Sequence, residues 1–300
     1  MNKILYKLHV VIPIGIWLEG AIGYAIINQS PILPTNIWSV IAGLVWLLPI
    51  YYAYTNLRGL FLGVEKKTKP VGNVNDETLH VVWVSRGTNM QALNRAVLQS
   101  IHNIYTYMRS RYGTLNVKLH VITDVKVTEA TQQRDVIYTH VPKDFKPQNG
   151  AKYKARALEY WRRSYDKRGF DDWVFHCDEE SIVTTPLIYG IHNFIRMHRK
   201  DKRVIGQGLI TYNGGKSALI PSLVDTVRSG DDMGRFRYQY KVKHKALFGM
   251  HGSFILYPSF VMDQITWDMG GNSITEDAEF ALRAQGKGYW FCWVTGYLQE

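Results

Sequence analysis

The chain has 300 residues, 46% of them hydrophobic, and a formal net charge of +11. That length suffices for one large domain with smaller appendages, and so basic a chain raises the possibility of a nucleic-acid partner. No zinc-finger, helix-turn-helix or RNA-binding motif accompanies the charge, so we expect no nucleic acid and favour a basic surface that faces anionic lipid. The two cysteines, Cys177 and Cys292, predict a reducing compartment and no disulfide.

Two long apolar segments begin the chain. Residues 4–27 contain few ionisable side chains, and residues 37–54 contain none. Each is long enough to span ~30 Å of hydrocarbon, and the short uncharged link between them carries two prolines. We therefore predict a transmembrane hairpin over residues 1–62, with spans at about 4–27 and 37–58. A cleaved signal peptide is the competing interpretation of the first segment, but that segment is long and a second span follows it.

Basic residues flank the predicted hairpin on both sides and are absent from its link. They are Lys3, Lys7, Arg58, Lys66, Lys67 and Lys69. Because cytoplasmic flanks of membrane helices carry an excess of Lys and Arg, this distribution predicts that both ends of the hairpin, and the whole chain after residue 70, lie in the cytoplasm.

Strands and helices alternate after a polar linker predicted over residues 63–78. The expected elements are a strand at 79–85, a helix at 90–109, strands at 117–122 and 136–141, a basic helix at 151–163, strands at 172–177 and 253–257, and a helix after Ser273. This alternation is typical of an α/β domain with a largely parallel sheet.

Three adjacent acids follow the buried strand that contains Trp173. Asp178, Glu179 and Glu180 lie where that strand leaves the sheet, and open α/β sheets bind ligands at such ends. Side chains of an extended chain alternate, so Asp178 and Glu180 are expected to point the same way. Two carboxylates held like this suit Mg²⁺ or Mn²⁺. The alternative is a solvated acidic turn.

The last predicted helix has a recognisable start. Ser273 and Glu276 match a capping box, with the acid three residues after a Ser cap. Asp277 then lies in the first turn, where the helix dipole favours an ionised carboxylate that can act as a general base. Pure capping by these acids is the alternative.

Several separated motifs agree with one family. They are Val84-Ser-Arg-Gly87, Val121-Ile-Thr-Asp124, Gly150-Ala-Lys-Tyr-Lys-Ala-Arg-Ala-Leu158, His176-Cys-Asp-Glu-Glu-Ser181, Gly206-Gln-Gly-Leu-Ile-Thr-Tyr212, Asp231-Asp-Met-Gly234, His251-Gly-Ser253 and Ser273-Ile-Thr-Glu-Asp277. With these motifs in this order, the chain resembles the inverting, membrane-bound family 2 glycosyltransferases, and within them the egghead-like β-1,4-mannosyltransferases. The resemblance implies a GT-A fold, Rossmann-like with a mostly parallel sheet, over residues 79–300.

The resemblance also implies roles for individual residues. Asp178 and Glu180 carry the metal and diphosphate role, with Mg²⁺ or Mn²⁺ as the ion, and Asp124 lies near the base or ribose of the donor. The basic residues expected near the nucleotide or its phosphates are Arg86, Lys152, Lys154 and Arg156. A solvated helix face is the alternative for Lys154 and Arg156.

Asp277 resembles the catalytic base of the family, which inverts the anomeric centre in one displacement. The residues expected on the acceptor side are His251, Gly252, Ser253 and Glu276. A simple pocket-lining role is the alternative for His251. Family members usually continue with a Gln-x-x-Arg-Trp motif and further membrane segments, which this sequence lacks, so we expect it to be truncated relative to the family.

The expected function is a metal-dependent hexosyltransferase that moves mannose from GDP-mannose to a lipid-linked or glycan acceptor. A polysaccharide or glucosylceramide synthase-like enzyme that uses a UDP-sugar is a close alternative. A non-catalytic scaffold that binds anionic lipid explains the charge and the hairpin, but not the acids at two separated element ends.

Overall fold

The computed structural model describes residues 47–63, 72–110, 114–128, 132–212, 227–270 and 275–300. The chain divides into two compact units. The first contains the described residues 47–63 together with Met233–Tyr238, and the second contains the remaining described residues up to Glu300.

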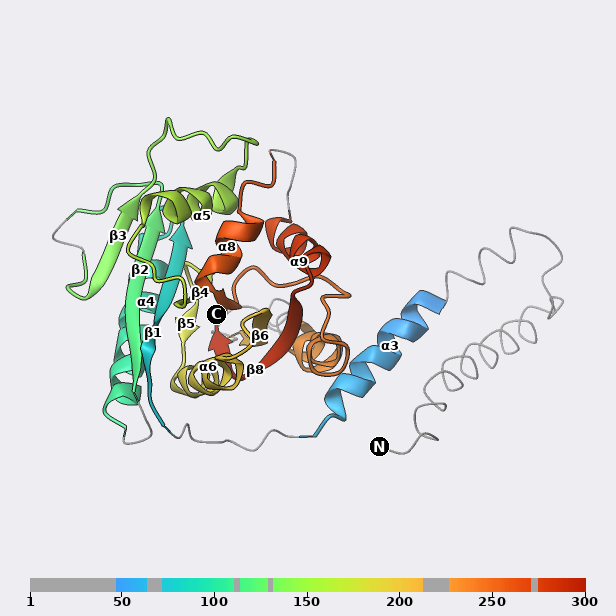
Figure 1. Cartoon of the computed structure of the whole chain (residues 1–300). Helices are drawn as coiled ribbons and strands as arrows, with labels where there is room; N and C mark the ends of the chain where they lie inside the picture. The colour runs from blue at the N-terminus through green and yellow to red at the C-terminus, as the bar shows by residue number, and fades with distance from the viewer. Residues whose placement is uncertain (1–46, 64–71, 111–113, 129–131, 213–226, 271–274) are drawn as a thin grey trace, which may run out of the picture. The chain divides into compact units, whose positions relative to one another are not determined.

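The second unit is built on one eight-stranded sheet in the order β3-β2-β1-β4-β7-β6-β8-β5 (Figure 1). Its strands are β1 (Val74–Ser85), β2 (Leu115–Thr123), β3 (Val136–His140), β4 (Trp173–Asp178), β5 (Ile182–Val183), β6 (Val204–Thr211), β7 (Ile255–Pro258) and β8 (Trp290–Gln299). The α-helices are α4 (Met90–Met108), α5 (Tyr153–Ser164), α6 (Thr185–His198), α8 (Ser259–Ile265) and α9 (Glu276–Gly286).

Strand direction decides which loops meet. β1 pairs in parallel with β2 and β4, and β6 pairs in parallel with β8. β7 runs antiparallel to both β4 and β6, so those two strands point the same way. The carboxyl ends of β1, β2, β4, β6 and β8 therefore lie along one edge of the sheet, together with the start of the reversed strand β7. The prediction of a largely parallel sheet is confirmed, and β7 and β5 are its reversed strands.

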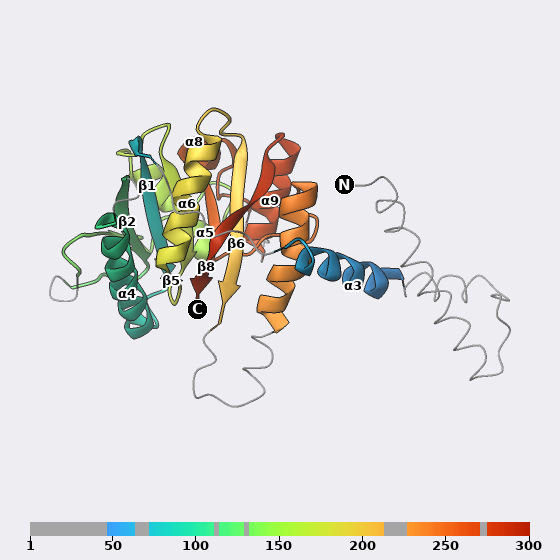
Figure 2. The ribbon, with the colours of Figure 1, turned by 90° about the horizontal axis from the view of Figure 1, so that it is seen from below.

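The sheet is covered on both faces. α4 and α6 pack against each other on one face and α5 packs against β1 and β2 on the other, an arrangement that Figure 2 shows from below. Alternate residues of β1 serve the two faces: Leu79, Val81 and Trp83 join the core with α4 and α6, while His80 faces Trp161 of α5. A strand buried on both faces is a near-continuous hydrophobic run, as β1 is.

A chain of buried polar groups lies beneath α5. His80 Nδ1 lies 3.0 Å from His120 Nε2, and His80 Nε2 lies 3.0 Å from an oxygen of Asp172. Both imidazoles are fully buried. Burial lowers the pKa of His80, although Asp172 opposes that shift, and burial together with the neighbouring His80 lowers the pKa of His120 to about 3. The two rings are therefore neutral in the folded protein at neutral pH.

These histidines predict acid-sensitive stability. Their folded pKa values lie below the unfolded value, so the unfolded chain binds more protons and stability falls as pH drops below about 6.5. For His120 the expected loss between pH 7.5 and pH 5 is about 2 kcal/mol, measurable by urea unfolding. His120→Gln should flatten this pH dependence, whereas His102→Gln, at an exposed site, should not. Equal slopes for parent and His120→Gln would show that His120 is not responsible.

Most predicted elements are confirmed, and the differences have physical causes. β1 begins at Val74, inside the segment predicted as a linker, because Val74 pairs with Leu115 at the start of β2. α6 and β8 have no counterpart among the predicted elements. α6 is capped by the Thr184 side chain, which accepts a hydrogen bond from Leu187 N, with a proline in its first turn. β8 is only partly buried, and its buried positions do not alternate regularly with exposed ones.

The first unit contains α3 (Leu47–Leu60). Its last turn is capped by the guanidinium of Arg237, which donates to the carbonyl oxygens of Gly59 and Gly63. The first predicted membrane span, residues 4–27, lies outside the described residues, and α3 is the described part of the second. Among the residues that the structure describes, no helix is both long and apolar enough to cross a membrane.

Candidate active site

The carboxyl edge of the sheet gathers the residues that the sequence singled out. Arg86 follows β1, Asp124 follows β2, and Asp178 ends β4, where it pairs in register with Val84 of β1. His251, Gly252 and Ser253 precede β7, which starts at this edge because the strand is reversed. Segments far apart in the sequence thus meet along one line of strand ends.

Lys154 is the centre of this arrangement. Its ammonium group forms an ion pair with Asp178 Oδ1 and donates to the carbonyl oxygen of Gly252 at 2.6 Å. A Cβ added to Gly252 would lie 3.3 Å from Lys154 Nζ and 3.4 Å from Asp277 Oδ2. The absence of a side chain at residue 252 therefore lets the ammonium and the two carboxylates of Asp178 and Asp277 converge. Lys154 belongs to the site rather than to a solvated helix face.

Two hydrogen bonds hold the acidic turn that follows β4. Ser181 Oγ accepts from Asp178 N at 3.2 Å, and Ser85 at the end of β1 donates to the carboxylate of Glu179. Glu179 is thereby tied to the scaffold, while Glu180 is exposed. Partial desolvation and the negative charges of Asp178 and Glu179 raise the pKa of Glu180. Asp178 and Glu180 thus remain the pair with oxygens available to a cation.

The start of α9 differs from its prediction. The helix begins at Glu276 with Thr275 as its N-cap, and the Thr275 side chain makes no capping hydrogen bond. Glu276 is therefore the first helical residue, whereas a capping box needs the acid at the third helical position. Ser273 lies outside the described residues. Asp277 still lies in the first turn, where its Oδ1 accepts from Ala278 N at 2.9 Å. Burial and the charges of Asp277 and Asp178 raise the pKa of Glu276, against the opposing effect of Lys154.

The expected acceptor-side residues are anchored by two carboxylates that the sequence analysis did not assign to the site. His251 Nε2 lies 2.5 Å from Asp232 Oδ1, and this contact, with the charges of Asp277 and Asp231, raises the pKa of His251 despite its burial. Asp232 also accepts from Ile210 N at 2.9 Å. The contact with Asp232 fixes the His251 ring and favours its protonated form.

Glu300 is the second of these carboxylates. Ser181 donates to it at 2.8 Å and Ser253 also hydrogen-bonds to it. Burial and the charges of Asp178 and Glu180 raise its pKa. Asp232 carried a signal, since it belongs to the Asp231-Asp-Met-Gly234 motif, but Glu300 carried none, because it follows β8, which was not predicted.

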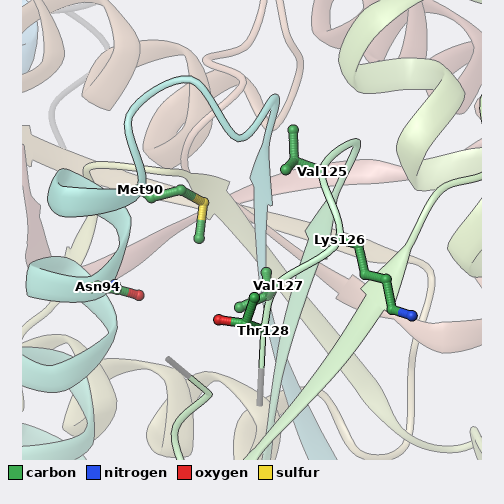
Figure 3. A pocket seen from close by; sticks show the side chains of 6 residues that line it. All are labelled: Met90, Asn94, Val125, Lys126, Val127 and Thr128. Atoms are coloured by element: carbon green, nitrogen blue, oxygen red, sulfur yellow. The ribbon is translucent and has the colours of Figure 1, made fainter. Parts of the chain in front are cut away.

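The expected nucleotide side is also assembled at this edge. Arg156 donates to Asp124 at 2.8 Å and to the carbonyl oxygens of Phe145 and Pro142, so its guanidinium fixes the loops around Asp124. Arg86 and Lys152 are exposed. Beside Asp124 lies a pocket of about 170 Å³, in which Met90 and Asn94 of α4 face residues 125–128 (Figure 3).

Within the described part of the chain, no group of three or more His, Cys, Asp or Glu side chains is arranged to hold a metal ion. Mg²⁺ that binds together with a phosphorylated substrate is held by one or two protein carboxylates, and phosphate and water complete its coordination. The carboxylates of Asp178 and Glu180 match this pattern. The residues present therefore fit an ion that arrives with a diphosphate, not a cation held by the protein alone.

Comparison with known proteins places this edge in context. Residues 173–300, which contain the acidic turn, the His251 segment and Asp277, match the model of Glycosyl transferase family group 2. The resemblance to family 2 glycosyltransferases is confirmed. The chain is 36% identical over 191 residues to Beta-1,4-mannosyltransferase egh of Drosophila melanogaster, covering 63% of this chain and 41% of the fly protein. It is 37% identical over 205 residues to Beta-1,4-mannosyltransferase bre-3 of Caenorhabditis elegans, covering 66% and 44% of the two chains.

The chain thus spans less than half the length of these curated relatives. Among solved structures, a mannosyltransferase from Pyrobaculum calidifontis, in complex with GDP-Man and Mn²⁺, has the same fold, with a TM-score of 0.53 and 13% sequence identity. The match covers 87% of this chain and 66% of the archaeal one. The α/β sheet is therefore of the GT-A type, as expected.

Proposed function

We propose that this protein is a membrane-bound inverting glycosyltransferase that transfers mannose from a nucleotide sugar to a lipid-linked or glycan acceptor, with a β linkage. The observation that carries the proposal is that Gly252 lies against both Asp277 and the Lys154 ammonium, which is itself paired with Asp178. One carboxylate ends a strand and the other begins a helix, so the site presents two separated acids to one small volume. The names of the fly and nematode relatives support mannose as the sugar.

The donor occupies the end of β4 in this proposal. Asp178 and Glu180 would hold Mg²⁺ or Mn²⁺, which would neutralise negative charge on the departing diphosphate. Lys154 supplies a fixed positive charge at the same place, and a preorganised cation stabilises a leaving anion without reorganisation. Asp124 lies near the donor base or ribose. Arg86 and Lys152 lie near the phosphates.

Asp277 acts as the general base. It removes the proton from an acceptor hydroxyl, and the oxygen attacks the anomeric carbon from the side opposite the diphosphate. The bond from the anomeric carbon to the diphosphate oxygen breaks as the new bond forms, and the nucleoside diphosphate leaves. A single displacement of this kind turns an α-linked donor into a β-linked product.

The acceptor approaches from the side of His251 and Ser253. Gly252 leaves room for its hydroxyl near Asp277, because any side chain there would meet Lys154 and Asp277 at 3.3–3.4 Å. Glu276, at the start of α9, borders the same space. The apolar segments at 4–27 and 37–58 fit an acceptor presented at a bilayer surface, with this domain on the cytoplasmic side. Protease added to sealed, right-side-out vesicles should then spare residues 80–300.

Donor identity is the decisive test. With Mn²⁺ present, the full chain is expected to bind GDP-mannose more tightly than UDP-glucose or UDP-N-acetylglucosamine in calorimetry. Tighter binding of a UDP-sugar would favour the alternative of a polysaccharide or glucosylceramide synthase-like enzyme. If no nucleotide sugar bound, with and without the ion, a non-catalytic lipid-binding scaffold would be the better description and the proposed transfer would be wrong.

A further inference from the structure

Tyr153 adopts a backbone conformation that tyrosine rarely adopts. It is the first residue of α5 and has a φ of +52°. In this left-handed region the Cβ atom of an L-residue is crowded by the backbone, so glycine is the residue usually found there. The tyrosine gains no burial in return, because 62% of its surface is exposed. Neither local conformational preference nor the hydrophobic effect therefore explains a tyrosine at this position.

The strained backbone is held from both sides. The carboxylate of Asp268 accepts hydrogen bonds from Asn149 N at 2.8 Å and from Ala151 N at 3.2 Å, which fixes the chain just before Tyr153. Directly after it, Lys154 is tied to Asp178 and to Gly252 O. Strain of this kind persists only where the surroundings impose it, and it concentrates at functional sites.

The Tyr153 ring has a specific contact. The guanidinium carbon of Arg86 lies 4.8 Å from the ring centroid, within the range of a cation–π interaction. Arg86 comes directly after β1, and the neighbouring Val84 is paired with Asp178. The ring therefore supports a guanidinium beside the acidic turn, at the edge where the donor is proposed to bind. Both side chains are exposed, so the contact contributes little to stability and leaves Arg86 accessible to a ligand.

We infer that Tyr153 is a positioning residue for Arg86: its ring holds the guanidinium in place to bind the diphosphate of a nucleoside diphosphate. A planar guanidinium binds phosphate oxygens through two parallel hydrogen bonds and loses affinity when its orientation is not fixed. Fixing a long side chain before binding removes part of the entropy cost of association. This inference rests on the proposed function, and it names a residue for which that function gives no role.

The test uses the full chain with GDP and UDP as probes, with Mn²⁺ present, and measures affinity by calorimetry. Tyr153→Gly should not lower the melting temperature, since glycine adopts a φ of +52° without strain. It should nevertheless weaken binding of the preferred probe about twofold to fivefold, the scale of a lost cation–π contact at an exposed site. Tyr153→Phe keeps the ring and should bind like the parent.

A double-mutant cycle with Arg86 separates positioning from direct contact. Because Tyr153 acts through Arg86, Tyr153→Gly combined with Arg86→Ala should bind no more weakly than Arg86→Ala alone. If the affinity loss of the double variant equalled the product of the two single losses, Tyr153 would contact the ligand independently, and the positioning role would be overturned. Unchanged affinity in Tyr153→Gly would overturn it as well. A parent that bound neither GDP nor UDP would contradict the proposed function itself, which is a different result from a parent that binds and a Tyr153→Gly variant that binds equally well.

Discussion

Replacing Asp277 with Asn is expected to lower the rate of sugar transfer on the order of 10²-fold or more, the usual scale for the loss of general-base help. Asn keeps the size of the side chain, and its Oδ1 can still accept the hydrogen bond from Ala278 N. It cannot take a proton from the acceptor. The affinity for nucleotide sugar should therefore stay near that of the parent, since Asp178 and Lys154 are unchanged. Rates with donor and acceptor, alongside donor affinity from calorimetry, measure the two effects separately.

Two neighbours in the first turn of α9 provide controls. Glu279→Gln removes the same charge, but Glu279 is paired with Arg283 on the surface of the helix, so its transfer rate should match that of the parent. Glu276→Gln should be milder than Asp277→Asn, because Glu276 borders the site without the role of base. If Asp277→Asn transferred sugar at close to the parent rate, Asp277 would be structural and the base would lie elsewhere.

Replacing Asp178 with Ala should abolish the gain in nucleotide-sugar affinity that Mn²⁺ provides. Asp178 is one of the two carboxylates proposed to hold the ion, and its loss would leave Glu180 as the only proposed protein ligand. The same change frees Lys154 from its ion pair and removes a negative charge near the diphosphate. Affinity without a divalent cation should therefore hold or increase. Calorimetry with Mn²⁺ and with a chelator compares the two conditions directly.

Asp263→Ala is a matched control for this change. Asp263 is also a partly exposed carboxylate in ion pairs with arginines, with 49% of its side chain exposed against 38% for Asp178, but it lies on α8. Its loss should leave the Mn²⁺ effect intact. An Asp178→Ala variant that still gained affinity from Mn²⁺ as the parent does would exclude Asp178 as a ligand, and equal effects of the two variants would point to a general loss of charge.

Local patterns were enough for the individual elements on the donor side. Trp173 to Cys177 is a mostly apolar strand, interrupted only by His176, because it is buried on both faces, and three acids mark its end. The helical spacing of Leu93 and Val97 likewise predicted α4 to within a residue of its observed bounds. Such patterns depend only on residues a few positions away in the chain, so they can be recognised from the sequence.

Other elements depend on distant partners. Residues 74–78 resemble a polar linker, yet Val74 is buried against the start of β2. The start of α9 is displaced toward its C-terminus relative to the capping-box prediction, since local capping preferences are weak beside tertiary contacts. Glu300 is brought beside Ser181 of the acidic turn by the antiparallel pairing of β8 with β5, and no local pattern predicts which strand will become its neighbour.

The sequence by itself determined the composition of the site: a strand ending in acids, a basic segment around Lys154, a glycine at 252 and an acid at 277, in the order typical of family 2 glycosyltransferases. Only the tertiary structure decided that Lys154 pairs with Asp178, that Gly252 lies against both Lys154 and Asp277, that Asp232 holds His251, and that Tyr153 is strained beneath Arg86. The reason is physical. Residue type and spacing set local conformation and charge, whereas strand order and direction set which chain ends meet, and these follow from packing across the whole sheet.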